Sequence, residues 1–463
     1  MATEILVFIP GILGSELWDG NDRIWPGSLW EAIRGFDEEK FQRLLKPGLV
    51  PRDILREAAG GLVGVYRPWI KAFESIRRGG TQPFVENPAG GTAKTLHPFP
   101  YDWRQDLRQT ANRLADFLDE IVATQADADL KLVCHSMGGL LARYYLESGR
   151  FTARRAFGRV SLLLTFGTPH NGAPKAYASA VGLHKAEFLS VEQTRRMAND
   201  DRYPSLFQLF PARGHSFVWA ADPAAAIKDY ASDEAALVQH YRLDASNLSA
   251  WHEFRQSLSG TPAGSIRYFY IVGSTQDTLV RFRWTGNELQ PIELDDAGDG
   301  TVPLSGAMQS SIQTDFVGKS HVSLIETRPA RETLAALFGG TTVLSAKDFD
   351  QVTLTVRDIV VDSDSPVHVQ ITFEPEVDRF KGALRFQRAD VPTEANAEVS
   401  TTGTVSFHDV VDRNEIPVDL TSSGISYLNL KSDALEYPGI YRPVLRRDAG
   451  PDVVGPEFVV QRA

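Results

Sequence analysis

LKLVCHSMGGLLARYYL, residues 130–146, joins a short apolar run to a second run with helical spacing across a break of small and polar residues. Residues 131–133 have the pattern of a buried strand, and the second run has apolar side chains at i, i+3 and i+4. Ser136 therefore lies in a strand-to-helix turn. This is the geometry of a nucleophile elbow, in which small residues flank an exposed serine. Gly138 fills one small position, and Cys134 stands where the G-x-S-x-G pattern has its first glycine. An ordinary turn is the alternative interpretation.

Composition limits the classes of protein that the chain can belong to. A length of 463 residues predicts two or three domains, and 43% hydrophobic with 23% charged residues is typical of a soluble globular protein. The net charge of −11 argues against a nucleic-acid partner. Cys134 is the only cysteine, which excludes an internal disulfide and a thiolate metal cluster, and neither a metal nor an organic cofactor is expected. Without a leader peptide or a run long enough to span a bilayer, a cytoplasmic location is the simplest expectation.

Strand-like and helix-like runs alternate from residue 1 to about 340. The alternation predicts an α/β fold with a mostly parallel sheet and helices on its faces. A helix is expected over 107–122, and a mostly helical cap insertion over about 174–260. The expected strands are residues 4–9, 94–98, 130–134, 160–166, 266–272 and 313–317.

The pattern changes after residue 340. Short segments alternate polar and apolar residues at period two, and Asp, Ser, Gly and Pro separate them. Residues 341–463 are therefore predicted to form an antiparallel, immunoglobulin-like β-sandwich that packs directly on the first domain. The segments are VTLTV (352–356), VHVQITF (367–373), ALRFQ (383–387), TVSFHDV (404–410), ISYLNL (425–430) and YRPVL (441–445).

A serine nucleophile needs a base, and the base needs a carboxylate to orient it. In α/β-hydrolases the three residues follow in the order Ser, Asp or Glu, His. Asp299 in the segment AGDGTVP is preferred over Asp296 because glycines on both sides permit a sharp turn, although a solvated acidic turn is the ordinary alternative. His321, in a loop after the last expected strand, follows the acid at the expected place.

Two backbone N–H groups are expected to bind the oxyanion of the reaction. One belongs to Met137, the residue after the nucleophile, and the other to Ile12, in the Gly-rich loop after the first strand. This loop, PGILGS, could also suggest a nucleotide site. It lacks the third glycine and the lysine of the phosphate-binding motifs, which argues against that interpretation.

Five stretches in matching order resemble the lecithin:cholesterol acyltransferase family of α/β-hydrolases. The resemblance implies Ser136 as nucleophile, Asp299 and His321 as its partners, and Ile12 and Met137 as oxyanion donors. It also implies lipid esters as substrates. Secreted relatives close a lid loop with a disulfide, which this chain cannot form. The stretches are IPGILGSEL (9–17), FPYDWRQD (99–106), CHSMGGLLARYYL (134–146), AGDGTVP (297–303) and KSHVSL (319–324).

Three further residues are candidates for substrate binding. Trp25 and Trp30 lie in the region that corresponds to the lid, where they could cover the site or contact lipid, and His170 could line the cleft. Packing roles are the alternative for all three. The Asp102-Trp103-Arg104 run is expected to support the pocket.

The sequence thus predicts a serine acyl hydrolase that cleaves lipid esters, of phospholipase A type, through an acyl-enzyme. The substrate is a lipid or another ester, with possible peripheral membrane contact. An acyltransferase that uses an alcohol acceptor is one alternative. The other is an interaction protein, in which the β-sandwich binds a protein partner and the hydrolase domain is a scaffold.

Overall fold

The structure is a computed structural model of the chain. It describes residues 2–89, 93–212, 218–220, 230–258, 262–343, 352–373, 380–391, 405–410, 415–420, 427–448 and 450–462.

A six-stranded parallel sheet forms the centre of the first 340 residues. Its strand order is β15-β12-β10-β9-β1-β8, and every neighbouring pair is parallel. Each of the six predicted strands is present, so the prediction of a mostly parallel α/β sheet is confirmed. The strands are β1 (Thr3–Ile9), β8 (Leu96–Pro98), β9 (Ala128–His135), β10 (Val160–Phe166), β12 (Arg267–Gly273) and β15 (Gln313–Val317).

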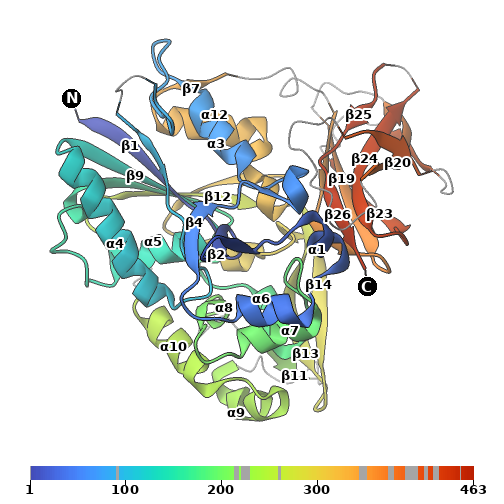
Figure 1. The fold of residues 1–463 in the computed structure, drawn as a ribbon, viewed down its shortest axis with the longest axis horizontal. Helices are drawn as coiled ribbons and strands as arrows, with labels where there is room; N and C mark the ends of the chain where they lie inside the picture. The colour runs from blue at the N-terminus through green and yellow to red at the C-terminus, as the bar shows by residue number, and fades with distance from the viewer. Residues whose placement is uncertain are drawn as a thin grey trace.

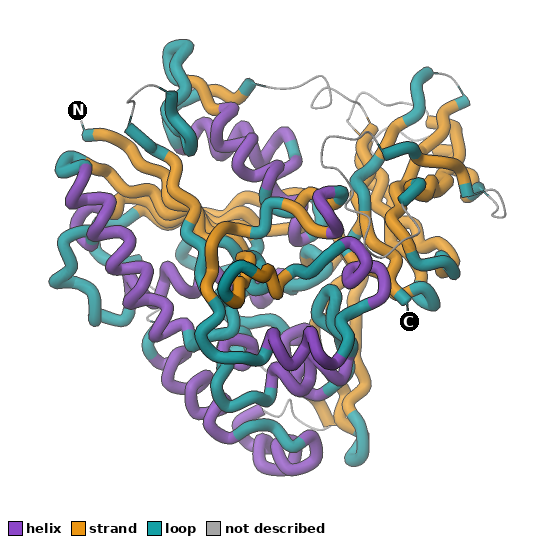
Figure 2. The backbone as a smooth tube through the Cα atoms, in the orientation of Figure 1, coloured by secondary structure: helices purple, strands orange, loops and turns teal. Residues whose placement is uncertain are grey.

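Helices cover both faces of this sheet, as Figures 1 and 2 show. Alternate residues of β1 point to opposite faces, as strand geometry requires: Ile5 and Val7 belong to one core cluster, Leu6 and Phe8 to the other. The predicted helix over 107–122 is α4 (Leu107–Thr124), which packs with α5 (Met137–Glu147) on the first face. The second face is covered by α3 (Arg67–Ser75) and α12 (Arg328–Leu337).

Several short elements of the first 342 residues carry no alternation that predicts them. One group follows the first strand: β2 (Ser15–Asp19), β3 (Asp22–Trp25), α1 (Leu29–Arg34), α2 (Glu38–Leu44) and β4 (Val50–Ile54). Small pairs also form between β5 (Glu57–Ala58) and β6 (Val63–Gly64), around η1 (Ala59–Gly61), and between β7 (Ile76–Arg77) and β16 (Thr341–Thr342). A long antiparallel hairpin, β13 (Gln276–Trp284) and β14 (Leu289–Gly298), precedes the short helix α11 (Leu304–Ala307).

The insertion predicted over 174–260 is mostly helical in its described part. It contains α6 (Pro174–Val181), α7 (Val191–Ala198), α8 (Ser205–Gln208), β11 (Val218–Ala220), α9 (Tyr230–Tyr241) and α10 (Ala245–Gln256).

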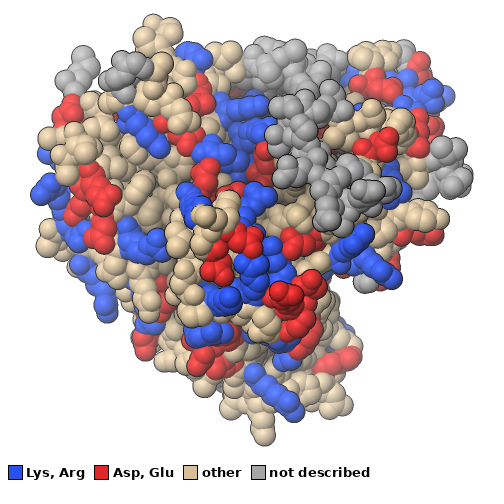
Figure 3. All heavy atoms as spheres, in the orientation of Figure 1, with Lys and Arg blue, Asp and Glu red and all other residues tan. Residues whose placement is uncertain are grey.

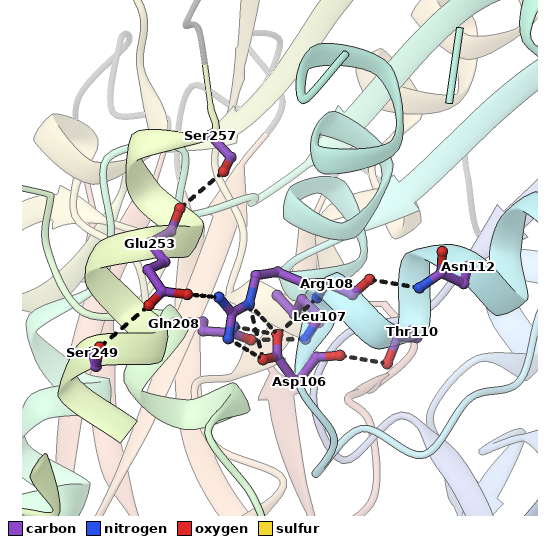
Figure 4. Close-up of polar contacts among 9 residues, drawn as sticks. All are labelled: Asp106, Leu107, Arg108, Thr110, Asn112, Gln208, Ser249, Glu253 and Ser257. Carbon is purple, nitrogen blue, oxygen red and sulfur yellow. Dashed lines mark hydrogen bonds and ion pairs between the residues drawn. The ribbon is translucent and has the colours of Figure 1, made fainter. Parts of the chain in front are cut away.

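Polar contacts tie this insertion to the start of α4, as Figure 4 shows. The Gln208 amide donates to Asp106 Oδ1 at 2.7 Å and accepts from the Leu107 N–H at 2.8 Å. Arg108 pairs with Asp106 and with Glu253 of α10. The N-terminus of α4 is therefore an anchor for α8 and α10.

The C-terminal region consists of strands that pack as two sheets around one core. One sheet has the order β17-β19-β23, and the other β18-β26-β24-β20-β21, with β22 and β25 at its sides. The core combines side chains of both sheets, such as Leu354 and Ile371 with Leu384 and Leu445. The all-β sandwich is therefore confirmed. The strands are β17 (Val352–Val356), β18 (Val360–Asp362), β19 (Pro366–Phe373), β20 (Phe380–Ala389), β21 (Phe407–Asp409), β22 (Ile416–Leu420), β23 (Tyr427–Ala434), β24 (Gly439–Arg447), β25 (Val453–Val454) and β26 (Phe458–Gln461).

One strand pair departs from the prediction of an antiparallel sandwich. Strand β18 pairs with β26 in parallel, with Val360 opposite Val459. Residue 404 of TVSFHDV and residues 425 and 426 of ISYLNL lie outside the described residues. The domain boundary near residue 340 and the immunoglobulin-like topology stay predictions.

The face of the molecule drawn in Figure 3 carries Lys, Arg, Asp and Glu side chains in an interspersed arrangement. Across the described ranges, none of the helices combines the length and the apolar character needed to cross a membrane.

Candidate active site

Ser136 lies between the end of β9 and the start of α5, as the sequence predicts. Its backbone has φ 53° and ψ −126°, a strained conformation for a residue with a side chain. The preceding Cys134 is fully buried in the sheet, between Ile9 of β1 and Thr165 of β10. Burial raises the pKa of its thiol well above the ordinary value, so Cys134 is a packing residue.

The two glycines after the elbow allow α5 to approach the sheet. A Cβ on Gly138 would lie 2.4 Å from the Ile9 carbonyl oxygen, and one on Gly139 would lie 2.1 Å from Thr168 Oγ1. The repeated glycine in CHSMGG therefore has a packing role that the elbow pattern alone does not show.

Asp299 and His321 are in direct contact. His321 Nδ1 lies 2.7 Å from Asp299 Oδ2, and the other carboxylate oxygen accepts the backbone N–H groups of Thr301 and Val302 at 3.0 and 2.7 Å. Asp299 is 1% exposed. Because the carboxylate accepts a hydrogen bond from Nδ1–H, the nitrogen of the neutral ring that can take up a proton is Nε2.

The rejected candidate Asp296 points elsewhere. Its carboxylate accepts hydrogen bonds from Tyr427 and Asn429 of the C-terminal β23, at 2.9 and 3.2 Å. Asp299 is thus the acid of this segment that contacts a histidine.

The loop after β1 lies beside the serine. A Cβ placed on Gly11 would be 2.9 Å from Ser136 Cβ, so a glycine is needed for this close approach. Ile12 lines the same cavity as Ser136. Met137 is the first residue of α5, and N–H groups in the first turn of a helix have no partner within the helix.

The FPYDWRQD stretch supports this loop. The Tyr101 hydroxyl donates to the Pro10 carbonyl oxygen at 2.9 Å, and Trp103 Nε1 donates to the Ser15 carbonyl oxygen at 3.2 Å. Arg104 and Asp102 form a buried two-point ion pair at 2.8 and 2.7 Å. The run is therefore a buried corner behind the PGILGS loop, as its sequence predicts.

His135, next to the serine, links three segments of the site. Gly11 N–H donates to the Tyr66 hydroxyl at 2.9 Å, and that hydroxyl lies 2.7 Å from His135 Nδ1. His135 Nε2 lies 3.0 Å from the His321 carbonyl oxygen, which can only accept. Nε2 therefore carries the proton, and Nδ1 accepts from Tyr66. Burial lowers the pKa of His135 well below its ordinary value, which keeps the ring neutral.

A cavity of about 180 Å³ lies in front of the serine. Its lining includes Ser136, His321 and Ile12, so the three predicted segments meet in one place. Much of the remaining wall is apolar, formed by Trp25, Phe188, Met197, Leu206 and Leu209. Polar residues of the insertion and of the C-terminal region form another part: Lys175, His184, Lys185, Glu187, Arg357 and Asp358.

The three residues expected to bind substrate lie in different places. Trp25 lines the cavity, and its Nε1 donates to the Leu13 carbonyl oxygen at 2.8 Å. Trp30 is outside the cavity lining among the described residues and lies under the Arg34 guanidinium. His170 is also outside that lining, since it is buried in the core, where it stacks on Tyr270 at 3.8 Å between ring centres. Its neighbour Pro169 reaches the cavity instead.

The sequence interpretation missed two contributions to the site. Tyr66 lies on the segment before α3, and Arg357, Asp358 and Ile359 lie between β17 and β18. No motif marks these positions, because only the folded chain brings them to the cavity. Within the described ranges, no group of three or more His, Cys, Asp or Glu side chains is placed to hold a metal ion.

The central part of the chain is similar to a known protein family. Residues 88–282 match the family model described as lecithin:cholesterol acyltransferase. No sequence among curated proteins matches the chain.

Solved structures with similarity to the chain have low identity. The lin2722 gene product of Listeria innocua is 13% identical over 72% of this chain and 92% of its own, with a TM-score of 0.31. A cutinase-like protein from Cryptococcus sp. is 12% identical over 37% of this chain and 57% of its own, with a TM-score of 0.19.

The parallel sheet with helices on both faces, the strand-to-helix turn at Ser136 and the family match agree with one another. The chain has an α/β-hydrolase fold followed by an all-β sandwich. The family match relates the chain to enzymes that hydrolyse or transfer the acyl groups of lipids. The predicted resemblance to the lecithin:cholesterol acyltransferase family is confirmed by the match over residues 88–282.

Proposed function

We propose that the protein is a serine acyl hydrolase that cleaves lipid esters, of phospholipase A type, through a covalent acyl-enzyme. The observation that carries the proposal is one cavity that holds both a strained elbow serine, Ser136, and His321, whose Nδ1 is held by the buried Asp299. Nucleophile, base and orienting acid are the parts that acyl transfer through a serine requires.

In the proposed reaction, His321 Nε2 takes the proton of the Ser136 hydroxyl as its oxygen attacks the ester carbonyl. The backbone N–H groups of Ile12 and Met137 bind the oxyanion. The protonated His321 then gives its proton to the leaving alcohol, and the C–O bond to that alcohol breaks. Water, deprotonated by His321, attacks the acyl-enzyme and releases the acid, and Ser136 regains its proton.

The walls of the cavity support a lipid ester as substrate. Trp25 and apolar residues of the insertion, among them Met197 and Leu209, offer a surface for an acyl chain. Trp30 and His170 lie apart from this lining, so Trp25 is the residue of the three that we retain for substrate contact.

Labelling with a fluorophosphonate probe tests the proposal directly. Wild-type protein should be labelled at one serine, and Ser136→Ala should lose the label and about 10⁶-fold in kcat. Ser148→Ala, at the other end of α5, is the matched control and should be labelled like the wild type. A folded wild-type protein that takes no label would contradict the proposal.

Transfer of the acyl group to an alcohol is the second candidate, and the family match supports it equally at the general level. The acyl-enzyme is common to both reactions, and only the acceptor differs. Mass spectrometry of the products formed with and without a lipid alcohol separates the two. Acyl transfer that exceeds hydrolysis would assign the protein to the transferases.

A further inference from the structure

The C-terminal sheets pack against the candidate active site. The orange and red strands of Figure 1 stand beside β14 and α1. Gln461 of β26 donates to the Ala32 carbonyl oxygen of α1 at 3.0 Å, and Lys185 pairs with Asp362 of β18. The C-terminal sheets therefore contact both the N-terminal segment and the insertion.

The residues just before His321 are held by the C-terminal strand β17. Lys319 Nζ donates to Thr353 Oγ1 at 3.2 Å and also to the Thr355 hydroxyl, and Ser320 Oγ donates to the Val356 carbonyl oxygen at 3.2 Å. Lys319 is buried, and burial lowers the pKa of its ammonium group to about 8. A buried ammonium group needs its hydrogen-bond acceptors, so the two threonines fix the segment that leads to His321.

The acid side of the site is held in the same way. A Cβ on Gly300, the residue after Asp299, would lie 2.9 Å from Arg357 Cγ, so the Arg357 side chain packs directly on the acid turn. Gln370 of β19 donates to Thr275 Oγ1 at 2.8 Å, in the turn between β12 and β13. Tyr427 and Asn429 of β23 also donate hydrogen bonds to Asp296, three residues before Asp299, and so hold the same segment.

The segment between β17 and β18 also forms part of the cavity wall. Arg357, Asp358 and Ile359 line the cavity together with Ser136 and His321. The Asp358 carboxylate is held by Arg357 Nε at 2.8 Å and by Lys175 of α6 at 3.7 Å. Lys175 Nζ also donates to the Gly300 carbonyl oxygen at 3.3 Å. The insertion, the acid turn and the C-terminal region therefore meet at this wall.

We infer that the C-terminal sandwich contributes to the active site in two ways. It positions the loop that carries His321. Through Arg357, Asp358 and Ile359 it also forms the part of the cavity wall that selects the ester substrate. The inference rests on the proposed function. The substrates it selects are amphipathic esters, with a polar group against the charged side chains of the lining and an apolar chain along Ile359 and the apolar residues of the insertion.

The positioning role is tested by Thr353→Val combined with Thr355→Val. This change keeps the shape of both side chains but removes the hydroxyl groups that hold Lys319. We expect kcat to fall about 10- to 100-fold with KM nearly unchanged, because a small displacement of a catalytic group lowers the rate of the chemical step. Ser320→Ala, which removes one hydrogen bond, should give a smaller fall in the same direction if the double variant does not fold.

Arg385→Gln is the matched control, because it removes the ion pairs with Asp409 and Asp452 within the same sheets. It should lower the melting temperature without changing kcat. Hydroxyl variants that lose stability but keep the wild-type kcat would overturn the positioning role. Absence of labelling in the wild type would instead overturn the proposed function itself, so the two failures are distinguishable.

The selecting wall is tested by Ile359→Trp, assayed with a series of p-nitrophenyl esters of rising acyl length. The larger side chain should lower kcat/KM for long acyl chains at least about 10-fold more than for the acetate, because a filled cavity excludes the longer chain. Val454→Trp, on an exposed position of β25, is the control. An unchanged chain-length profile in Ile359→Trp would overturn the selecting role.

Discussion

Asp299 and Asp296 lie three residues apart and differ in what they contact. Asp299 is buried against His321 Nδ1, whereas Asp296 accepts hydrogen bonds from the C-terminal sheet. In Asp299→Asn the side chain no longer stabilises the protonated base, so kcat should fall about 10⁴-fold. Asp296→Asn keeps an acceptor oxygen for Tyr427 and should lose far less. Steady-state kinetics of both variants measure the difference, and equal losses would contradict the assignment of Asp299.

Tyr66 joins the loop after β1 to the residue beside the nucleophile. In Tyr66→Phe, Gly11 N–H and His135 Nδ1 both lose a buried partner. Each unsatisfied buried group costs about 1–3 kcal/mol, so the free energy of unfolding should fall by about that amount or more. Because Gly11 adjoins Ile12, kcat should fall as well, with little change in KM. Chemical denaturation and kinetics on the same protein measure the two effects.

Tyr145→Phe is the comparison for this variant. The Tyr145 hydroxyl is buried and makes no hydrogen bond to any residue that the structure describes, although the ring packs against Phe151 and Phe157. Removing this hydroxyl should leave stability unchanged or raise it slightly, because no partner is lost. A loss in Tyr145→Phe as large as in Tyr66→Phe would show that the cost comes from packing and not from the hydrogen bonds.

At the scale of the elements, periodicity was sufficient for the parallel sheet. The strands over 4–9 and 160–166 are continuous apolar runs, because helices cover both faces of the sheet. Strands that are buried on neither face leave a weaker pattern. The hairpin strand β14 is mostly polar and partly exposed, so its sequence has the composition of an acidic loop. The parallel pair of β18 and β26 joins segments about 100 residues apart, which no local pattern can predict.

The residues of the candidate site also fall into two groups, those that a sequence motif predicts and those that no local pattern predicts. Ser136, Asp299 and His321 each stand in a short motif with a fixed order, so the sequence was enough to propose them. Tyr66 and Arg357 reach the cavity only through tertiary packing, and neither has a local signature. His170 shows the reverse case: the segment TFGTPHNGAP suggests a site residue, but the side chain turns into the core and stacks on Tyr270.

Gln208 connects the insertion to the start of α4 through its hydrogen bonds with Leu107 and Asp106, and this connection can be tested. Gln208→Met keeps the length of the side chain but leaves the Leu107 N–H and one oxygen of Asp106 without Gln208. The free energy of unfolding should fall by about 1–3 kcal/mol. KM should rise, because Leu206 and Leu209, on both sides of Gln208, line the cavity. Ser249→Ala on α10, which loses only an exposed hydrogen bond to Glu253, should change neither quantity, and a similar effect in both variants would contradict the anchor.

At the scale of the whole molecule, the acid and base loops lie between two large bodies of structure. The parallel sheet presents them from one side, through the ends of β12 and β15, and the C-terminal sheets hold them from the other. A loop held from both sides favours a fixed geometry for Asp299 and His321. The proposed site therefore depends on the docking of the C-terminal region as well as on its own motifs.

Histidines whose pKa is lowered by loss of hydration should make the stability of the whole molecule depend on pH. Burial lowers the pKa of His135 and His170 well below 6.5. His184 is half-buried in the cavity wall, where loss of hydration lowers its pKa to about 3. Below pH 6.5 the unfolded chain binds protons at these residues and the folded chain does not, so stability falls as the pH falls. Glu187, whose pKa burial raises, acts in the opposite direction but is a single group.

The melting temperature should therefore be lower at pH 5 than at pH 7.5. His184→Gln removes one of the titrating groups, and the dependence of stability on pH between about 6.5 and 3 should become less steep by up to about one proton. Denaturation curves measured at several pH values give this slope for both proteins. A variant with the wild-type slope would show that His184 is already charged in the folded state, which its position beside Lys175 and Arg357 disfavours electrostatically.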